Sequence, residues 1–363
     1  MSVLITIGSF LFLIVILLIC LVIILRRKKA GIEKDNLCSV AMTELSMDND
    51  FQLDSGAKRF SYEELLEATN NFAQGEKLGL GGFGSVYRGY LKSLNSYVAI
   101  KRVLKLSTQG LREYASEVKV ISRLRHRNLV QLIGWCHRNE DLLLVYEFMS
   151  NRSLDFHLFE SKSSLTWPMR HNIARGMASV GFFPLNFAVF YLHEECEKCV
   201  LHRDIKSSNV MLDSCFNPKL GDFGLSRLVD YEAGFWQTTM LGGTLGCMAP
   251  ECVTVGRASR ESDVYSFRVV ALEIATGRKA VERVTKGDDK KQELEVLVEW
   301  VWELYGMEKI LEAVDPKLCG EFDEENNEEI NGCWAVVCSP RLQAKAFHKA
   351  SDSCARFRSS HPR

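Results

Sequence analysis

Five short motifs follow one another along this chain, and their order and spacing constrain its fold more than any other feature. They are LGLGGFGSVYRG from Leu78, VAIK ending at Lys101, HRDIKSSN from His202, DFG from Asp222 and APE ending at Glu251. Any one of them could arise by chance, but five of them in this order do not arise by chance. The motifs extend from Leu78 to Glu251, and the length of 363 residues allows two or three folded units with a large buried core.

The first motif is glycine-rich, and Gly79, Gly81 and Gly84 have the spacing G-x-G-x-x-G. Glycines at such positions let backbone N–H groups approach phosphate oxygens closely. Alone, the pattern fits a dinucleotide-binding fold equally well, but there the glycines lead into a helix, whereas here Val86 and Tyr87 indicate a returning strand. The motif also lacks the G-K-[ST] ending of a Walker-type phosphate loop. It predicts a phosphate-binding turn between two strands.

In this order and spacing the motifs match the protein-kinase set, and the chain resembles that family from about Phe72 to about Asp315. The resemblance implies an α+β, bilobal protein-kinase fold, with a small β-rich lobe at 72–149 and a large helical lobe at 150–315. Lys206 within HRDIKSSN resembles the Ser/Thr-kinase form of that loop. The runs FSYEELLEATNNF, HRNLVQLIGWC, LVYEFM and VVALEIATGRK resemble plant receptor-like kinases, in particular the group with an L-type lectin ectodomain.

An ATP site follows from the resemblance. Lys101, held by Glu117 of a helical segment, would bind the α- and β-phosphates. By resemblance, Tyr146 would lie at the back of the adenine pocket and the backbone of Glu147 and Met149 would pair with the ring edge, although these three residues could equally be ordinary strand core. The other predicted ATP contacts lie in the glycine-rich motif: Leu78, Gly79, Leu80, Gly81, Gly82, Phe83, Gly84 and Val86.

Roles in the HRDIKSSN and DFG motifs follow from phosphoryl transfer, where positioning and charge neutralisation do most of the catalysis. We expect Asp204 to accept or orient the proton of the substrate hydroxyl, with Lys206 near the transferred phosphoryl group. Asn209 and Asp222 would hold Mg²⁺ against the triphosphate. The predicted cofactors are therefore ATP and Mg²⁺, and the predicted substrates are proteins with Ser or Thr hydroxyls.

The segment between the DFG and APE motifs carries three candidate phosphorylation sites, Thr238, Thr239 and Thr244. Arg203, which precedes the predicted catalytic aspartate, is counted with the catalytic residues because it could pair with an added phosphate. The charge of such a phosphate, about −1.5 to −2, would order the segment.

Residues 2–25 contain no charge and, at 1.5 Å per helical residue, are long enough to cross a hydrocarbon core of roughly 30 Å. The basic run 26–29 (RRKK) that follows is typical of the cytoplasmic side of a span. A cleaved signal peptide would need a basic start, a shorter apolar stretch and a small-residue cleavage site. The sequence therefore predicts one transmembrane helix in a lipid bilayer, with the N-terminus outside and the kinase domain in the cytosol at the plasma membrane.

Residues 26–71 are predicted to form a juxtamembrane linker that ends in a short helix. The part at 30–59 is polar and without periodicity. Ser61 and Glu64 then have the spacing of a capping box, and Phe60 is placed to act as a hydrophobic staple. A helix should run from there to about Asn70.

A cytosolic domain keeps its thiols reduced, so the twelve cysteines predict no disulfide framework. His193, Cys196, Cys199 and His202 are each three residues apart, a spacing that also resembles a zinc site. The alternative is that this segment ends a helix and enters a loop, with His202 already part of HRDIKSSN. We favour the loop.

Several features depart from the family pattern. About eight extra residues at 180–187 (VGFFPLNF) interrupt a helix, where a proline costs about 3 kcal/mol. Arg268 stands where the family has a glycine on a buried helix, and an unpaired buried guanidinium would cost several kcal/mol. Cys247 replaces a tyrosine near APE. The tail at 316–363 diverges and becomes basic, which puts the last large-lobe helices and the partner of Glu251 in doubt.

Two functions from different classes fit the chain. The first is an active membrane-anchored Ser/Thr kinase in cell-surface signalling, with a co-receptor or a second copy as a possible partner. The second is a catalytically impaired ATP-binding scaffold, or a nonfunctional truncated receptor product. The formal net charge of −1 provides no basic field, so we expect no nucleic-acid partner. The length fits an anchor and a kinase domain, and we expect the lectin ectodomain to be absent.

Overall fold

The computed structural model describes residues 57–318, except for short internal segments at 82–83, 104–107, 139–140, 161–164, 178–187, 233–234, 238–241 and 287–290. The predicted span, most of the predicted linker, the insert at 180–187 and the tail beyond Leu318 therefore lie outside the described residues. Within the described part, no helix is both long and apolar enough to cross a membrane. The transmembrane helix stays a prediction from the sequence.

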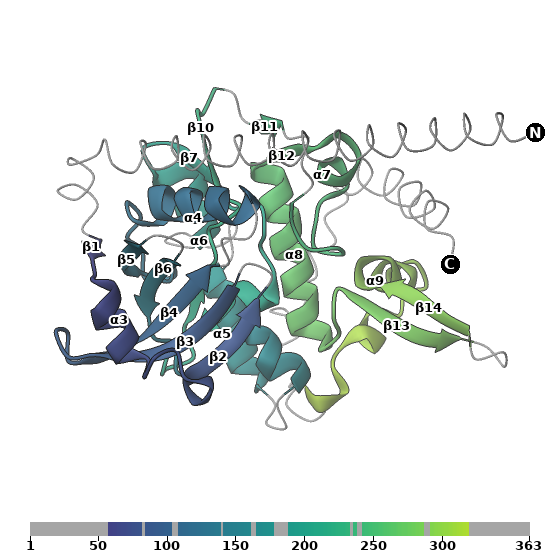
Figure 1. Ribbon diagram of the computed structural model, residues 1–363. Coiled ribbons are helices and arrows are strands. Elements are labelled where there is room, and N and C mark those ends of the chain that lie inside the picture. Colours follow the sequence, from purple (N-terminus) through teal and green to yellow (C-terminus); the bar gives the residue numbers. More distant parts are fainter. Residues whose placement is uncertain are drawn as a thin grey trace, which may run out of the picture.

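A six-stranded sheet forms the smaller part of the molecule, in the order β1-β5-β6-β4-β3-β2 (Figure 1). Its neighbours pair antiparallel, apart from β1, which runs parallel to β5. The strands are β1 (Lys58–Arg59), β2 (Lys77–Gly81), β3 (Gly84–Leu91), β4 (Ser96–Val103), β5 (Leu132–Arg138) and β6 (Asp141–Glu147). β6 is buried over its five central residues, which makes it the centre of this sheet.

Two helices accompany the sheet. The short helix α3 (Tyr62–Ala68) lies where the linker helix was predicted, and the Ser61 hydroxyl accepts a hydrogen bond from the Glu64 N–H across 3.1 Å. Phe60 is buried in one cluster with Leu65, as a hydrophobic staple requires. The longer helix α4 (Thr108–Ile121) packs its buried residues into the main hydrophobic core.

The larger part is mainly helical, and α8 (Arg260–Thr276) runs through its middle beside α5 (Trp167–Met177) (Figure 1). The other α-helices are α6 (Ala188–Phe190), α7 (Pro250–Val255) and α9 (Leu297–Gly306). Short strand pairs complete this part: β7 (Cys199–Leu201) with β10 (Arg227–Val229), β8 (Val210–Leu212) with β9 (Pro218–Leu220), β11 (Phe235–Gln237) with β12 (Arg257–Ser259), and β13 (Val281–Lys286) with β14 (Lys291–Val296). This arrangement confirms the predicted α+β fold with a β-rich and a helical part.

Remaining short helical turns connect these elements. They are η1 (Gln74–Glu76), η2 (Phe156–Glu160), η3 (Tyr191–Glu195), η4 (Ser207–Asn209), η5 (Ile310–Ala313) and η6 (Pro316–Leu318). α5 ends at Met177 and α6 begins at Ala188, so these two helices flank the inserted residues 180–187. Ala188 and Val189 of α6 are fully buried in the main core, which shows that the chain rejoins the core after the insert.

Eleven of the 17 residues of helix α8 are buried. Ser259 and Ser262 form a capping box at its start, and Gly277 ends it in the left-handed conformation with φ of 65°. Arg268 on this helix is half-buried and has an interaction partner. Its Nε atom is buried, but because the side chain has an interaction partner, the expectation of an unpaired guanidinium at this position is wrong.

The end of the larger part is held by a buried ion pair. Arg170 of α5 donates a hydrogen bond to Asp315 across 2.7 Å, and two further bonds to the carbonyls of Leu165 and Ile274. The Asp315 N–H in turn donates to the Ala275 carbonyl. These bonds join α5, α8 and the turns after α9. The described elements are therefore packed together up to Leu318, although the sequence begins to diverge from the family near that residue.

Candidate active site

The first group of site residues is a cluster of three charges between the sheet and the larger part. The ammonium nitrogen of Lys101 on β4 lies 2.9 Å from Glu117 Oε2 on α4 and 2.8 Å from Asp222 Oδ1 in the DFG motif. The Glu117 side chain is only 2% exposed, whereas that of Asp222 is 26% exposed. Three residues from distant parts of the sequence therefore present one lysine between two carboxylates.

Lys101 and Asp222 stabilise each other's charge, whereas burial raises the pKa of Glu117 despite the nearby lysine. Burial alone would lower the pKa of Lys101, but the negative charges of Asp222 and Glu117 raise it overall. Burial would raise the pKa of Asp222, and the positive charge of Lys101 lowers it instead. The Tyr146 hydroxyl donates a hydrogen bond to Glu117 Oε1. Burial and the charge of Glu117 raise the pKa of Tyr146 well above its ordinary value, so this phenol stays protonated and remains a donor.

The second group is the HRD loop, which we define as residues 202–209. Lys206 Nζ lies 2.8 Å from Asp204 Oδ2, and Asn209 donates from its side-chain amide to the Asp204 carbonyl and to Oδ2, across 2.8 and 3.2 Å. The Thr244 hydroxyl donates to Asp204 Oδ1 across 2.9 Å and accepts from Lys206 Nζ across 3.0 Å. One carboxylate thus receives donors from a lysine, an amide and a hydroxyl.

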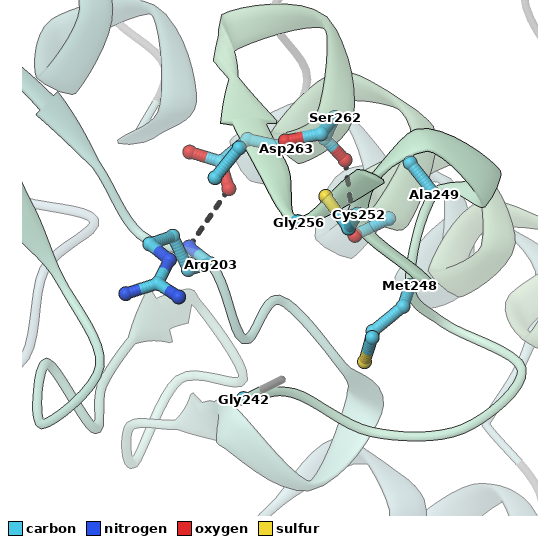
Figure 2. A pocket seen from close by; sticks show the side chains of 10 residues that line it. Arg203, Gly242, Met248, Ala249, Cys252, Gly256, Ser262 and Asp263 are labelled. Carbon is cyan, nitrogen blue, oxygen red and sulfur yellow. Dashed lines mark hydrogen bonds between the residues drawn. The ribbon is translucent and has the colours of Figure 1, made fainter. Parts of the chain in front are cut away.

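The aspartate Asp263 of α8 fixes the start of the HRD loop. It accepts hydrogen bonds of 2.8 Å from the backbone N–H groups of His202 and Arg203, and it lies 3.0 Å from His193 Nε2. Burial would raise the pKa of Asp263, but these hydrogen bonds and the nearby histidines lower it. Figure 2 shows the Arg203 backbone meeting Asp263 while the guanidinium points away. The same view shows the Cys252 sulfur facing the Ser262 side chain.

Two residues of the site have backbone angles that disfavour ordinary side chains. Arg203 has φ of 71° and Asp222 has φ of 64°. The hydrogen bond to Asp263 holds the backbone of Arg203 in this conformation. Asp222 precedes Phe223, which is 1% exposed and packs edge-on against the His202 ring, with the ring centroids 4.7 Å apart. Such strain persists only where surrounding structure over-determines it, and it is concentrated at functional sites.

The glycine-rich motif spans part of β2 and the start of β3, and Gly82 and Phe83 between these strands lie outside the described residues. A Cβ on Gly79 would meet no atom within 4 Å, so the space above it is open. A Cβ on Gly84, where φ is 151°, would lie 2.0 Å from the Arg102 carbonyl oxygen, so only glycine fits there. Leu78 and Leu80 are exposed, and Val86 pairs in register with Lys101.

The end of β6 and the residues just after it carry the remaining predicted ATP contacts. Tyr146 and Met149 are buried. Glu147 accepts from the Gln131 N–H and lies 2.8 Å from Lys219 Nζ. The hydrogen bond from the Tyr146 hydroxyl to Glu117 gives this tyrosine a specific contact beyond strand packing. The burial of Met149 fits an adenine contact and an ordinary core residue equally well.

The candidate phosphorylation sites separate in the structure. Thr238 and Thr239 lie outside the described residues. The Thr244 hydroxyl forms hydrogen bonds with Asp204 and Lys206 of the HRD loop, as described above. The sequence missed this bond, and it also missed Asp263, which no motif includes. No local signal marked Asp263, because an acidic residue in the first turn of a capped helix is common for its interaction with the helix dipole alone.

The histidines and cysteines with zinc-like spacing have other partners. His193 contacts Asp263, His202 contacts the Gly221 carbonyl, and the Cys196 sulfur donates to the Tyr191 carbonyl. Cys199 is buried in a small apolar cluster. Among the residues that the structure describes, no group of three or more metal-binding side chains comes together.

Comparison with known proteins adds to this geometry. The family described as "Protein kinase domain" matches residues 72–351. The chain is 53% identical over 314 residues to "L-type lectin-domain containing receptor kinase IX.1" of Arabidopsis thaliana, which covers 86% of this chain and 45% of that protein. It is 46% identical over 276 residues to "L-type lectin-domain containing receptor kinase SIT2" of Oryza sativa subsp. japonica, which covers 76% of this chain and 39% of that protein. The chain spans less than half the length of these relatives.

Proposed function

This chain belongs to the protein kinase family, and from that premise we propose that it is a membrane-anchored Ser/Thr protein kinase in cell-surface signalling. It would transfer the γ-phosphate of ATP to Ser and Thr hydroxyls of protein substrates. The observation that carries this proposal is the contact of Lys101 with both Glu117 and Asp222, because it brings two distant motifs to one lysine. A lysine held in this way is placed to bind the inner phosphates of a nucleotide.

Asp204 is the residue we propose to receive or orient the proton of the substrate hydroxyl. Its Oδ1 already accepts from the Thr244 hydroxyl, which supports its capacity to accept from an alcohol in this position. Lys206 lies 2.8 Å from Oδ2 of the same carboxylate, from where its ammonium group can reach a transferred phosphoryl group. Arg203 would stabilise the segment between the DFG and APE motifs.

The two proposed metal ligands have the chemistry that Mg²⁺ prefers. Asp222 offers a carboxylate whose lowered pKa keeps it ionised, and Asn209 donates its amide N–H to Asp204, which leaves the amide oxygen as the atom to face a cation. When bound, Mg²⁺ would neutralise charge on the phosphates of ATP. The open space at Gly79 supports the approach of phosphates to the glycine-rich motif, with Leu78 and Val86 on either side of the adenine.

The domain organisation belongs to the same proposal. Residues 2–25 would anchor the chain in the plasma membrane with the N-terminus outside, 26–71 would link the anchor to the kinase domain, and the tail would begin at 316. The relatives are named as receptor kinases with an L-type lectin domain. That name supports a role in surface signalling in plants, and a role in defence with a co-receptor or a second copy as partner belongs to the same proposal.

One observation favours the second candidate, an impaired scaffold. α5 ends at Met177 and α6 begins only at Ala188, so the insert separates two helices of the larger part. The proposed nucleotide and HRD-loop residues are nevertheless brought together, which supports the active kinase more strongly.

The test is a phosphorylation assay on the full chain in detergent micelles, with Mg-ATP and a protein substrate. The matched control is Asp204→Asn, which keeps the shape of the side chain and removes its basicity. We expect transfer to Ser and Thr residues well above the control. Activity equal to that of Asp204→Asn, together with nucleotide binding, would instead establish the scaffold.

A further inference from the structure

The helix α4 carries Glu117 and also contacts the larger part of the molecule through residues that the proposed mechanism does not use. It lies beside β10, which begins shortly after the DFG motif (Figure 1). A Cβ added to Gly224 of that motif would lie 3.3 Å from the Glu113 Cβ on α4, so the helix and the DFG backbone are in close contact. About one helical turn further along α4, hydrogen bonds take the place of this packing.

Ser116 makes these hydrogen bonds from α4 to the larger part. Its hydroxyl donates to the Ser226 carbonyl across 2.7 Å and accepts from Arg227 Nη1 across 2.9 Å. The same Nη1 atom also donates to the Ser226 carbonyl, across 2.7 Å. The hydroxyl, the guanidinium and the carbonyl therefore form a closed triangle. A hydrogen bond from a charged donor, such as the one that Ser116 accepts, is about twice as strong as a bond between neutral groups.

Ser226 connects this triangle to the HRD loop. Its side chain is fully buried, and its hydroxyl donates to the His202 carbonyl across 3.3 Å. Its backbone N–H donates to the Phe223 carbonyl across 3.0 Å, which closes a turn on the DFG motif. The next residue, Arg227, pairs in register with Leu201 of β7, directly before the HRD loop. One buried serine thus contacts α4, the DFG motif and the HRD loop.

The position of Ser116 on α4 links the triangle to the charge cluster. Ser116 and Glu117 are adjacent in sequence, so their side chains leave the helix about 100° apart. The Glu117 carboxylate contacts Lys101 across 2.9 Å, while the Ser116 hydroxyl contacts the larger part. Because a helix moves as a rigid unit, α4 cannot turn away from Ser226 without also moving Glu117 relative to Lys101.

We propose that Ser116 is a positioning residue: its hydrogen bonds to Ser226 and Arg227 fix the rotation of α4 and thereby hold Glu117 against Lys101. Lys101 is then presented to the inner phosphates of the nucleotide, so Ser116 affects nucleotide binding through Glu117. Because the affected step is nucleotide binding, this proposal rests on the kinase function proposed above.

The first experiment measures the dissociation constant of Mg-ADP for the full chain in detergent micelles. Ser116→Ala removes the hydroxyl, whereas Arg227 keeps its bond to the Ser226 carbonyl. We therefore expect binding to weaken roughly two- to tenfold, the effect of about one hydrogen bond. Ser116→Thr retains a hydroxyl and should restore the affinity. Unchanged affinity in Ser116→Ala would overturn the proposal.

The matched control is Ser122→Ala, which makes the same change just after α4. The Ser122 side chain is fully buried, and its hydroxyl makes no hydrogen bond to the residues that the structure describes. ADP binding should therefore be unchanged in this variant. A loss as large as that in Ser116→Ala would overturn the proposal, because it would show that the loss does not depend on the triangle.

A double-mutant cycle separates positioning from general stabilisation of the fold. If Ser116 acts through Glu117, Ser116→Ala should change ADP binding by less than about twofold in a chain that already carries Glu117→Gln. Losses that simply multiply would show that the two residues act independently, and they would overturn the proposal.

A second measurement does not depend on the nucleotide. Hydrogen–deuterium exchange reports the protection of peptides from α4 in the free chain. We expect faster exchange there in Ser116→Ala, with Ser116→Thr and Ser122→Ala matching the unmodified chain. If the unmodified chain binds no ADP, the kinase function proposed above fails, and faster exchange in α4 still supports positioning of the helix by Ser116. Exchange in α4 that is the same in all four proteins overturns the proposal.

Discussion

Arg170 and Asp315 form a buried ion pair of 2.7 Å across 145 residues of sequence, with side chains only 1% and 4% exposed. The sequence placed the last large-lobe elements in doubt because the chain diverges from its family near this point. The pair shows that α5 and the turns after α9 are nevertheless joined. It also makes the end of the larger part sensitive to single substitutions.

Substitution of Asp315 by alanine should destabilise the protein strongly. It leaves the Arg170 guanidinium buried without its charge partner, and breaking a buried pair typically costs about 3–5 kcal/mol. Urea unfolding followed by tryptophan fluorescence measures the loss. The exposed pair of Lys309 and Glu312 provides the control, since Glu312→Ala should cost less than about 1 kcal/mol. Equal losses in the two variants would contradict the role of burial.

Removal of the Glu117 charge should weaken phosphoryl transfer. Glu117→Gln keeps the volume of the side chain but gives Lys101 one charged partner instead of two. Hydrogen bonds to charged groups contribute about 1.5–3 kcal/mol, so we expect kcat/KM to fall by roughly ten- to a hundredfold. Steady-state kinetics with varied ATP measures the change. Unaltered kcat/KM would show that Lys101 is positioned by Asp222 alone.

A phosphate on Thr244 should inhibit the enzyme. The Thr244 hydroxyl bonds to both Asp204 and Lys206, so a negative group there would repel the proposed base and occupy its lysine. We expect Thr244→Ser to keep activity, Thr244→Ala to lose two- to tenfold, the effect of about one hydrogen bond, and Thr244→Glu to lose more. A peptide phosphorylation assay compares the three. Higher activity in Thr244→Glu would reverse this assignment.

Activation through the other two threonines needs its own test. The double variant Thr238→Ala with Thr239→Ala leaves Thr244 untouched, so its effect is not mixed with that of the HRD-loop hydroxyl. If phosphorylation at these positions orders the segment before APE, the double variant should have lower activity than the unmodified chain after incubation with ATP. Unchanged activity would reject the hypothesis for both sites.

Stability should depend on pH through Glu273. Its pKa is raised from 4.5 to about 7 in the folded protein, so between these values the folded state binds a proton that the unfolded state does not. Stability therefore decreases as pH rises from about 4.5 to about 7, by an amount on the order of 3 kcal/mol, and is then constant with respect to this group. Urea unfolding at several pH values should show a smaller decrease in Glu273→Gln. The same pH dependence of stability in both proteins would show that the pKa of Glu273 is not raised on folding.

Arg268→Gly, which restores the residue typical of the family, should not stabilise this protein. Arg268 is half-buried and has an interaction partner, and glycine in a helix costs about 1 kcal/mol relative to alanine. We therefore expect a lower melting temperature, with Arg268→Ala intermediate. A gain of several kcal/mol would mean that the guanidinium is a buried unpaired charge after all.

Local patterns in the sequence predicted local structure well. The Ser61 cap and the buried Phe60 are both present at the start of α3. The helix ends at Ala68 instead of the predicted Asn70, because the Thr69 hydroxyl bonds back to the Leu65 carbonyl and Asn70 has φ of 51°. The residue at which α3 ends depends on backbone angles that the residue types alone did not specify.

The candidate site was predictable where chemistry requires particular residues at fixed spacing. The pairing of Lys101 with Glu117 was predicted, and Asp222 was assigned to the same site as a metal ligand, but its direct contact with Lys101 was not predicted. Asp263 and Glu273 could not be predicted, since both look like ordinary helical acids and gain their meaning only from loops that fold against them. Contacts between distant segments are set by packing, and packing is not encoded in local spacing.

Asp263 and Glu273 stand ten residues apart on α8, about 15 Å along a helix axis. Asp263 holds the first two residues of the HRD loop, whereas Glu273 accepts a hydrogen bond from the Ala280 N–H just beyond the end of the helix. A residue inserted into α8 between the two acids would turn one relative to the other by about 100°. The position of Asp263 under the HRD loop therefore depends on the length of α8 as much as on the residues of the loop.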